Sequence, residues 1–265
     1  MTRKKPTVAD LKACKGKSQM TMLRYFTLDE AAAAEASGID IASVPPTLVS
    51  DPRYRAVAPS VFSMTGKTHL EYGAADEYLR FAGQMLQAGA DALYCSGSLK
   101  TVEYLAREFI PVVGHVGLVP ARATWTGGYR AVGKTAKEAI VLFDECRRYQ
   151  DAGAFAVEIE VVPVEVATAI SKHLDLLLWS MGSGLGCDAQ YLFAEDILGE
   201  NRAHVPRHAK VYRNFAIEYD RLQAERVKAF TEFRSDVAAG TFPESKHVLK
   251  MDERELDSFM KAIGK

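Results

Sequence analysis

Short apolar runs alternate with amphipathic, helix-like segments along most of the chain. Most of the amphipathic segments begin or end with the polar and glycine residues that are typical of helix ends. This alternation predicts parallel strands connected by helices. Seven strands are expected, over residues 19–23, 39–44, 61–64, 92–95, 110–118, 154–162 and 176–179.

A chain of 265 residues is long enough for eight βα units to close into one barrel. We therefore predict an α/β protein with a (β/α)8 TIM barrel and C-terminal helices over 218–239 and 253–262, in a single domain that covers residues 1–265. The eighth strand has the weakest pattern. Segment 209–212, or a short piece near Leu198, is expected to form it, and 188–198 is predicted to be helical.

The most apolar strand carries two carboxylates. Alternation places Ala156, Glu158 and Glu160 on one face of this strand and Val157, Ile159 and Val161 on the other, and Pro163 then ends the strand and opens a helix. The aliphatic face can pack under helices, so the acidic face must point at polar groups. A carboxylate in such dry surroundings needs a partner or a proton, and catalytic bases are found at such positions.

Composition excludes several classes of function. The 33 Lys and Arg nearly balance the 34 Asp and Glu, and no long basic block occurs, so nucleic acid is not an implied partner. The amino terminus is polar, and no apolar run approaches the roughly 18 residues of a membrane span, so a soluble, cytoplasmic protein is expected. The cysteines are isolated and suggest neither a disulfide framework nor a zinc site; they are Cys14, Cys95, Cys146 and Cys187.

The carboxyl ends of the strands supply the candidate site residues, because barrel enzymes hold their active sites there. These residues are Arg24, Thr47, Lys67, His69, Ser96, His115, Glu160 and Ser180. Glu160 is the best candidate for a base that takes a proton from carbon, since burial would raise its pKa. A structural carboxylate that holds a loop is an equally supported interpretation from these residues alone.

Other candidates also fit simpler structural roles. His115 could donate to a substrate oxygen, although a lone histidine is more often structural. Glu158 is expected to form a buried ion pair, with Arg24 as the first partner to test. The glycines at 182, 184 and 186 could cradle a phosphate, but tight-turn geometry accounts for them at least as well.

Several stretches together resemble the ketopantoate hydroxymethyltransferase family, barrel enzymes related to the phosphoenolpyruvate mutase and isocitrate lyase superfamily. The matching pieces are Pro111-Val112-Val113-Gly114-His115-Val116-Gly117-Leu118-Val119-Pro120, Gly127-Gly128-Tyr129, Glu160-Val161-Val162-Pro163-Val164-Glu165, Ser183-Gly184 with Asp188 and Gln190, and 204–210. The resemblance implies a transferase of pantothenate biosynthesis, a homo-oligomer of up to ten subunits, and attack of a 2-oxo acid enolate on 5,10-methylenetetrahydrofolate. Glu160 matches the family's base, and His115 matches the histidine that approaches the substrate.

The amino-terminal part departs from the family pattern. Pro46, Gly66 and Ser96 occupy the positions where the resemblance implies carboxylate ligands of magnesium, and Tyr94 matches the family's lysine. Without these carboxylates a magnesium site is not expected, so we predict no metal ligand. Arg24, Lys67 and His69 on the same rim would instead bind an anion, although solvated rim charges account for the two cations equally well.

Two hypotheses follow. The first is a divergent, metal-independent enzyme that makes or breaks a C–C bond of a 2-oxo acid, with Glu160 and His115 as catalytic residues. The expected substrate-binding residues are Thr47, Ser96, Arg24, Lys67, Tyr94 and Ser183. The second is a non-catalytic relative that binds a carboxylate or phosphate in the same pocket. A small molecule is the expected partner in both.

Overall fold

The computed structural model describes residues 3–67, 69 and 71–264. Its contacts divide the chain into two units, the first ending at Arg213 and the second beginning at Asn214. All eight strands lie in the first unit. Because the chain separates into these two units, a single domain over residues 1–265 stays a prediction.

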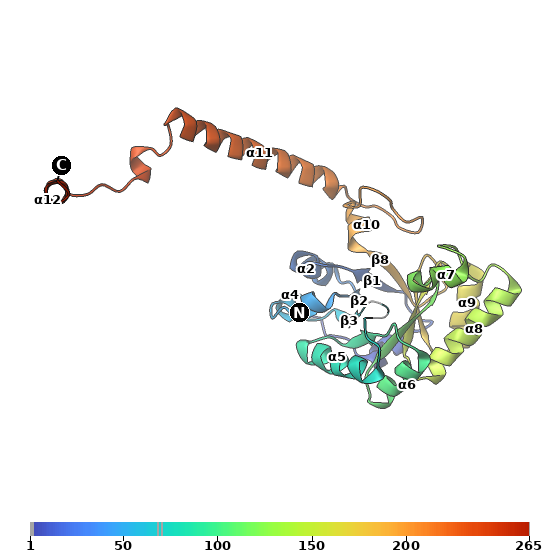
Figure 1. Cartoon of the computed structure of the whole chain (residues 1–265). Helices are drawn as coiled ribbons and strands as arrows, with labels where there is room; N and C mark the ends of the chain where they lie inside the picture. The colour runs from blue at the N-terminus through green and yellow to red at the C-terminus, as the bar shows by residue number, and fades with distance from the viewer. Residues whose placement is uncertain (1–2, 68, 70, 265) are drawn as a thin grey trace. The chain divides into compact units, whose positions relative to one another are not determined.

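Eight parallel strands close into a barrel in the order of the sequence, which confirms the predicted architecture (Figure 1). Strand β1 pairs with both β2 and β8, so the described sheet closes on itself. The strands are β1 (Met20–Arg24), β2 (Ile41–Ser43), β3 (Phe62–Gly66), β4 (Ala92–Tyr94), β5 (Val112–Gly117), β6 (Ala156–Glu160), β7 (Leu177–Met181) and β8 (Ala189–Phe193).

The eighth strand is where the sequence prediction was wrong. Strand β8 occupies residues that were expected to be helical, and segment 209–212 is not a strand. Ala189 and Tyr191 point into the barrel, so the strand follows the two-residue period, but it has only five residues before helix α10 begins at Ala194. So short a period-two pattern next to a helix is easily taken for part of that helix.

Helices surround the barrel, and local signals fix several of their ends (Figure 1). Thr27 and Glu30 form the expected capping box of α2, and Gly38 ends that helix in the left-handed conformation. The helices of the first unit are α1 (Val8–Cys14), α2 (Leu28–Ser37), α3 (Pro46–Val49), α4 (Tyr54–Val57), α5 (Ala75–Ala88), α6 (Leu99–Arg107), η1 (Pro120–Arg122), α7 (Ala123–Thr126), α8 (Ala136–Asp151), α9 (Val164–His173) and α10 (Ala194–Leu198).

Two layers of apolar side chains form the core. The outer layer lies between sheet and helices and contains Val157 and Ile159 of β6, which confirms the predicted aliphatic face of this strand. The inner layer fills the barrel with Phe62, Met64 and Trp179, among others. Leu11 of α1 joins this inner layer, so α1 closes the amino-terminal end of the barrel. The other end is left open for a site.

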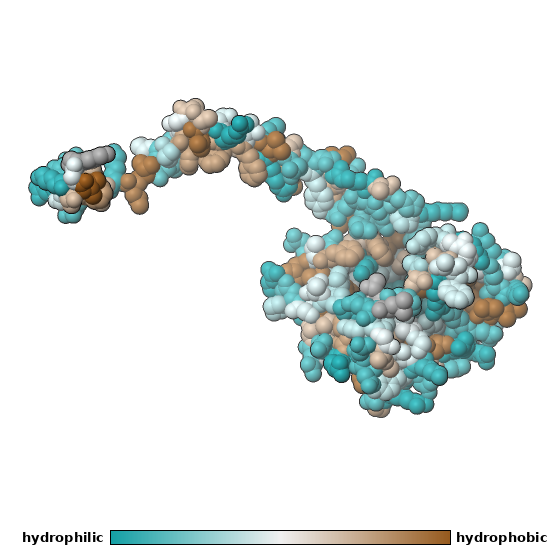
Figure 2. All heavy atoms as spheres, viewed as in Figure 1, coloured by the Kyte–Doolittle hydropathy of each residue, from teal (hydrophilic) through white to brown (hydrophobic). Residues whose placement is uncertain are grey.

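The C-terminal unit contains α11 (Phe215–Ala239), η2 (Ser245–His247) and α12 (Glu253–Ala262), so both predicted helices are present. Helix α11 buries none of its residues, and apolar side chains mark its surface (Figure 2). No described helix combines the length and the apolar character that a membrane span requires.

Candidate active site

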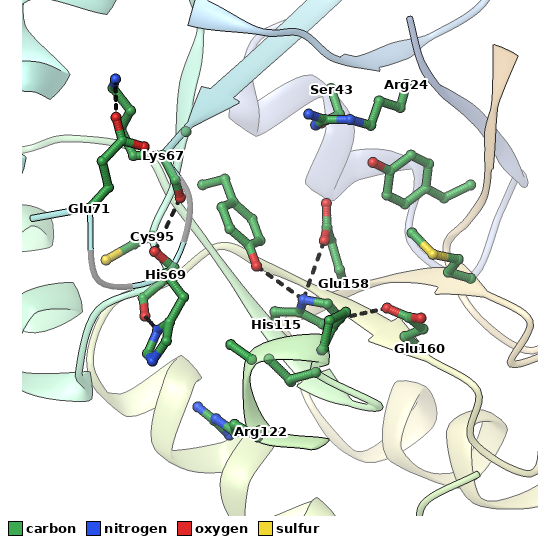
Figure 3. Close-up of a pocket in the computed structure, with 18 of the residues that line it drawn as sticks. Arg24, Ser43, Lys67, His69, Glu71, Cys95, His115, Arg122, Glu158 and Glu160 are labelled. Carbon is green, nitrogen blue, oxygen red and sulfur yellow. Dashed lines mark hydrogen bonds and ion pairs between the residues drawn. The ribbon is translucent and has the colours of Figure 1, made fainter. Parts of the chain in front are cut away.

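A cavity of about 540 Å³ opens at the carboxyl end of the barrel (Figure 3). Every strand contributes to its lining, either with its own last residues or with the loop that follows. The predicted site residues that the structure brings together here are Arg24, Thr47, Lys67, His69, Tyr94, Ser96, His115 and Glu160. Ser180 and Ser183 do not line the cavity.

Glu160 and His115 meet in this cavity. Glu160 is the last residue of β6, and His115 lies on the neighbouring strand β5. Their side chains approach at 3.1 Å between Glu160 Oε2 and His115 Nε2. The carboxylate is therefore oriented by a histidine and keeps its second oxygen for other partners, which is an arrangement suited to a general base.

Glu158 lies one layer deeper and faces the same histidine. The β5–β6 register sets His115 opposite Glu158, and the distance from Nδ1 to Glu158 Oε2 is 3.7 Å. Burial raises the pKa of the Glu158 carboxyl to about 7, while His115 and Arg24 counteract this rise. Arg24 is not within ion-pair distance, so the predicted Arg24–Glu158 pair is wrong and His115 takes that place. The reason is the β5–β6 register, which no local pattern encodes.

Tyr94 completes this group from β4. Its hydroxyl lies 3.0 Å from His115 Nδ1 (Figure 3). Burial raises the pKa of the Tyr94 hydroxyl, and the charge of Glu158 adds to the rise, so this group keeps its proton. One imidazole thus contacts a tyrosine hydroxyl and lies between two carboxylates.

The backbone after Glu160 has an uncommon conformation. Val161 has a φ of 49°, a region that β-branched residues rarely occupy. Buried Ser183 supports this turn, because its Oγ donates to Ile159 O at 2.9 Å and accepts from Val162 N at 3.1 Å. The structure therefore does not place Ser183 with the predicted substrate-binding residues: it supports the segment that presents Glu160.

The glycine loop after β7 is explained by packing. A Cβ on Gly184 would lie 2.4 Å from a methyl carbon of Val164, and one on Gly186 would lie 1.8 Å from Thr168 Oγ1. Helix α9 therefore leaves no room for side chains there. None of the three glycines lines the cavity at the end of the barrel.

Arg24 lies on the opposite wall of the cavity. Its guanidinium donates to Ser43 Oγ at 2.9 Å and lies over the rings of Phe26 and Phe193, with its central carbon 5.2 and 5.8 Å from their centroids. The side chain has no carboxylate partner within 4 Å among the described residues. Aromatic walls beside such a guanidinium suit a small carboxylate ligand.

Lys67 and His69 are on the rim but are more strongly engaged. Lys67 forms an ion pair with Glu71, which raises the pKa of its ammonium group, and its charge faces the rings of Tyr72 and Phe81. His69 Nδ1 lies 3.2 Å from the backbone oxygen of Ser96. The described contacts therefore leave Arg24 the least neutralised cation of the predicted anion site.

The positions that the resemblance assigns to metal ligands offer few oxygen donors. Pro46 and Gly66 have no side-chain oxygen, and Ser96 Oγ donates to Lys67 O at 3.2 Å. Across the described residues, no cluster of three or more His, Cys, Asp or Glu side chains could hold a metal ion. The donor set at these three strand ends does not fit an octahedral magnesium ion, which needs several hard oxygen ligands.

Sequence reasoning missed several residues of the cavity wall. Ser43 and Tyr191 point inward from β2 and β8, and Arg122 and Tyr149 line the side near β5. Tyr191 belongs to a segment that was expected to be helical. Because strand β8 was not predicted, the inward direction of this side chain was not predicted either. Arg122 follows the motif that ends at Pro120, a signal that could have drawn attention to it.

Known proteins resemble this chain along most of its length. A family model described as ketopantoate hydroxymethyltransferase matches residues 61–245. The 3-methyl-2-oxobutanoate hydroxymethyltransferase of Thermotoga neapolitana is 33% identical over 91% of this chain and 95% of its own length. That of Halalkalibacterium halodurans is 36% identical over 74% of this chain and 70% of its own. A third, from Methylibium petroleiphilum, is 30% identical over 99% of this chain and 95% of its own.

Solved structures share the fold at low identity. Phosphonopyruvate hydrolase, in complex with oxalate and Mg²⁺, matches with a TM-score of 0.51 and 14% identity, over 97% of this chain and 98% of its own. A 2,3-dimethylmalate lyase of the PEP mutase/isocitrate lyase superfamily matches with a TM-score of 0.50 and 14% identity, over 97% of both chains. These structures therefore share the barrel fold that was predicted for this chain.

Proposed function

The chain belongs to the ketopantoate hydroxymethyltransferase family, and we propose that it forms a carbon–carbon bond on a 2-oxo acid through an enolate. The observation that carries this proposal is the Glu160–His115 pair at the open end of the barrel. The relatives are named for 3-methyl-2-oxobutanoate, so this acid is the first substrate to test. Such an activity would serve pantothenate biosynthesis.

Glu160 is the base in this proposal. Its carboxylate takes the proton from the carbon next to the ketone, the C–H electron pair forms the enolate double bond, and the ketone oxygen gains the negative charge. Glu160 has the position for this step because it ends β6 at the cavity, and its other oxygen is held by His115. The enolate carbon then attacks an electrophilic one-carbon unit.

Arg24 binds the substrate carboxylate in this proposal, and Tyr94 donates to the enolate oxygen. Arg24 has no carboxylate partner within 4 Å among the described residues, and a guanidinium pairs well with a carboxylate. Thr47, Ser96, Lys67 and His69 complete the polar rim. Preorganised donors aimed at an oxyanion lower the barrier to enolisation, typically by about 3–4 kcal/mol for one donor.

The one-carbon donor implied by the family is 5,10-methylenetetrahydrofolate. When bound, it would supply the methylene group that becomes the new hydroxymethyl carbon, with water as the source of the hydroxyl and tetrahydrofolate as the leaving group. A cavity of about 540 Å³ exceeds what a five-carbon acid fills. The apolar wall of Val119, Pro120 and Ala121 is the part of the lining that would contact the donor's ring.

The residues present do not fit the magnesium ion that the family implies, so we propose an enolisation that does not depend on a metal. The support is the replacement of three expected carboxylates by Pro46, Gly66 and Ser96. In the same cavity, Glu160 contacts His115 and Glu71 contacts Lys67. Charge on the enolate oxygen would then be stabilised by Tyr94, while Arg24 holds the substrate carboxylate.

Deuterium exchange tests this function. The protein is incubated with 3-methyl-2-oxobutanoate in D₂O, and loss of the C3 proton is followed by NMR, with excess chelator and with added magnesium. We expect exchange that chelator does not reduce, and a fall of at least about 100-fold in Glu160→Gln, because the base is removed. Glu165→Gln, an exposed carboxylate on α9, is the matched control.

The other outcomes separate the alternatives. Exchange that requires added magnesium would overturn metal independence and restore ordinary family chemistry. No exchange with any 2-oxo acid, together with binding of one by calorimetry, would favour the non-catalytic relative. Exchange that survives in Glu160→Gln would remove this residue from the role of base.

A further inference from the structure

Three neighbouring strands place side chains around one guanidinium. Arg24 ends β1, and its register partners are Ser43 on β2 and Phe193 on β8. Alternation turns Tyr191, two positions before Phe193, to the same inner side of the barrel. All four residues line the cavity. The group therefore forms only because the barrel closes between β1 and β8.

The hydroxyl of Ser43 holds one edge of this guanidinium. Arg24 Nη1 donates to Ser43 Oγ at 2.9 Å, and Ser43 is only 4% exposed (Figure 3). The central carbon of the guanidinium also lies over the rings of Phe26 and Phe193. Arginine has five N–H groups in a planar fork, so a side chain held in this way keeps donors for a ligand in the cavity.

Tyr191 approaches the same guanidinium from one layer deeper. It is 2% exposed, and its ring centroid lies 5.8 Å from that of Phe193. Burial raises the pKa of the Tyr191 hydroxyl, whereas contacts with Ser43 and Arg24 counteract this rise, so the hydroxyl lies beside both residues and keeps its hydrogen. Two buried hydroxyls and two rings thus limit the directions in which Arg24 can point.

We propose that Ser43 and Tyr191 are positioning residues, which hold Arg24 as a preorganised site for the carboxylate of the ligand. This inference deepens the role given to Arg24 and rests on the proposed function. A guanidinium held in advance loses little freedom on binding, and it pairs with the two oxygens of one carboxylate.

The proposal defines a class of ligands. A metal ion would bind a 2-oxo acid as a chelate, through its carboxylate and its ketone oxygen together, so both groups would be needed. Arg24 requires the carboxylate alone, and the ketone adds one neutral hydrogen bond from Tyr94. Short carboxylates with an apolar chain are therefore expected to bind here whether or not they carry a 2-oxo group.

A role for Arg24 towards Glu158 is the competing interpretation. The charge of Arg24 favours the ionised form of Glu158, although the two side chains form no ion pair within 4 Å among the described residues. An arginine that served only this acid would not contribute to the affinity for a ligand. Binding measurements on Arg24 variants therefore separate the two roles.

The first test measures binding without turnover. Ligand-observed NMR, in excess chelator, gives the Kd of 3-methyl-2-oxobutanoate and that of 3-methylbutanoate, which lacks the ketone. We expect the two values to agree within about tenfold, the most that one neutral hydrogen bond contributes. A larger preference for the 2-oxo acid would overturn the proposal. So would the absence of binding of both acids at millimolar concentration.

The second test removes the groups around Arg24. Ser43→Ala and Tyr191→Phe should each raise the Kd of both acids about tenfold, and Arg24→Gln should raise it at least about 20-fold. In the Arg24→Gln background, Ser43→Ala should have less than about a twofold effect, because it acts through the guanidinium. A full effect of Ser43→Ala in that background would overturn the proposal, as would an unchanged Kd in Arg24→Gln.

Two buried residues outside the cavity provide matched controls. Tyr25 follows Arg24 in the chain but lies in the outer layer of the core, where its hydroxyl is 2.9 Å from that of Tyr54. Ser63, on β3, also contacts the Tyr54 hydroxyl. Tyr25→Phe and Ser63→Ala should each change the Kd by less than about twofold. Controls that weaken binding as much as Ser43→Ala would show a general effect of lost buried hydroxyls and overturn the proposal.

Turnover gives a separate result. In a protein that turns over a 2-oxo acid, Ser43→Ala and Tyr191→Phe should raise KM about tenfold and change kcat by less than about threefold, since Glu160 and Tyr94 are untouched. A fall in kcat with an unchanged KM would overturn the positioning role. A protein that turns over no 2-oxo acid would refute the proposed function, and the Kd values would then decide this inference alone.

Discussion

Glu158 and Glu160 are two residues apart on β6, but they meet different surroundings. The Glu160 side chain is 13% exposed at the open end of the barrel, whereas that of Glu158 is 7% exposed below it. Water and a histidine can both solvate the upper carboxylate. The lower one depends on protein groups alone, so its charge lowers the free energy of unfolding, a cost that is common in functional sites.

Replacing Glu158 by Gln should make the stability of the protein less dependent on pH. Burial raises the Glu158 pKa from 4.5 to about 7, so the folded state binds more protons than the unfolded state between these values. The stabilising contribution is present below pH 4.5 and is lost as pH rises through 7. We expect urea denaturation to show that, from pH 4.5 to pH 8, the free energy of unfolding of Glu158→Gln rises relative to that of the parent by up to about 3 kcal/mol.

An exposed carboxylate provides the control for this stability measurement. Glu165→Gln removes a surface charge from the next helix and should follow the parent at every pH. A parent whose stability relative to Glu158→Gln is constant from pH 4.5 to pH 8 would contradict the raised pKa of Glu158. If Glu158→Gln raises the free energy of unfolding but lowers turnover, then Glu158 serves the activity at a cost in stability.

The sequence predicted the residues of the site better than their pairing. Glu160, His115 and Arg24 were predicted at the cavity because strand ends in a closed barrel converge, whatever the register. The His115–Glu158 contact depends on how β5 is offset against β6, which the whole barrel sets. Ser183 was expected to bind substrate, but its hydroxyl instead bonds to the backbone on both sides of Glu160.

Strands β5 and β6 are in close contact beside Glu160. Gly117 ends β5 opposite Glu160, with a φ of 85°. A Cβ at this position would lie 2.3 Å from the backbone oxygen of Glu160, which also accepts a hydrogen bond from Leu118 N at 2.8 Å. A glycine is therefore required both for its conformation and for this close contact.

Gly117→Ala should damage both stability and turnover. The left-handed conformation costs about 1–2 kcal/mol for alanine, and the contact forces the Glu160 backbone to shift as well. We expect urea denaturation to show that the free energy of unfolding falls by at least about 2 kcal/mol. We also expect kcat to fall by a larger factor than KM rises. Gly127→Ala is the matched control, since Gly127 has a φ of 79° and open space around it. Equal losses in the two variants would show that the contact with Glu160 has no effect.

Elements with strong local signals were predicted well, and the weak ones were not. Strand β6 and helix α2 follow from alternation, from a capping box and from a terminal glycine. Strand β8 did not, because its five residues run directly into α10 and the preceding glycine loop hides its start. Its identity is fixed by closure of the barrel, where it pairs with β1 over five residues. Tertiary pairing of this kind overrides local preference.

At the scale of the whole molecule, the family's barrel is kept while the residues at its mouth differ from those that the family implies. The ends of strands β1 to β6, which were predicted to carry site residues, line one cavity. The expected metal positions are Pro46, Gly66 and Ser96, and a cation from the chain, Arg24, lines the same cavity. A barrel allows such exchange because each strand end can change without altering the sheet below it.

Helix α11 carries an exposed apolar face, on which the expected homo-oligomer can be tested. Val227, Phe230, Phe233 and Val237 are spaced by three or four residues and share one face, and each is at least half exposed. A continuous apolar face of this kind is typical of a surface that another chain covers. A second copy of this chain is the occupant that the resemblance implies. We therefore expect analytical ultracentrifugation of the purified protein to give a mass that is a multiple of 29.1 kDa.

Polar substitutions on the apolar face of α11 should lower the mass of the assembled protein. We expect Val227→Ser with Phe230→Ser to weaken association at least about 100-fold in analytical ultracentrifugation, since two large apolar side chains would lose roughly 3 kcal/mol or more of burial. Glu232→Ser, on the opposite side of α11, should leave the mass unchanged. If the double variant keeps the parent's mass at micromolar concentration, this face is not where the subunits meet. If the parent itself is a 29.1 kDa monomer, then the oligomer inferred from the family does not extend to this chain.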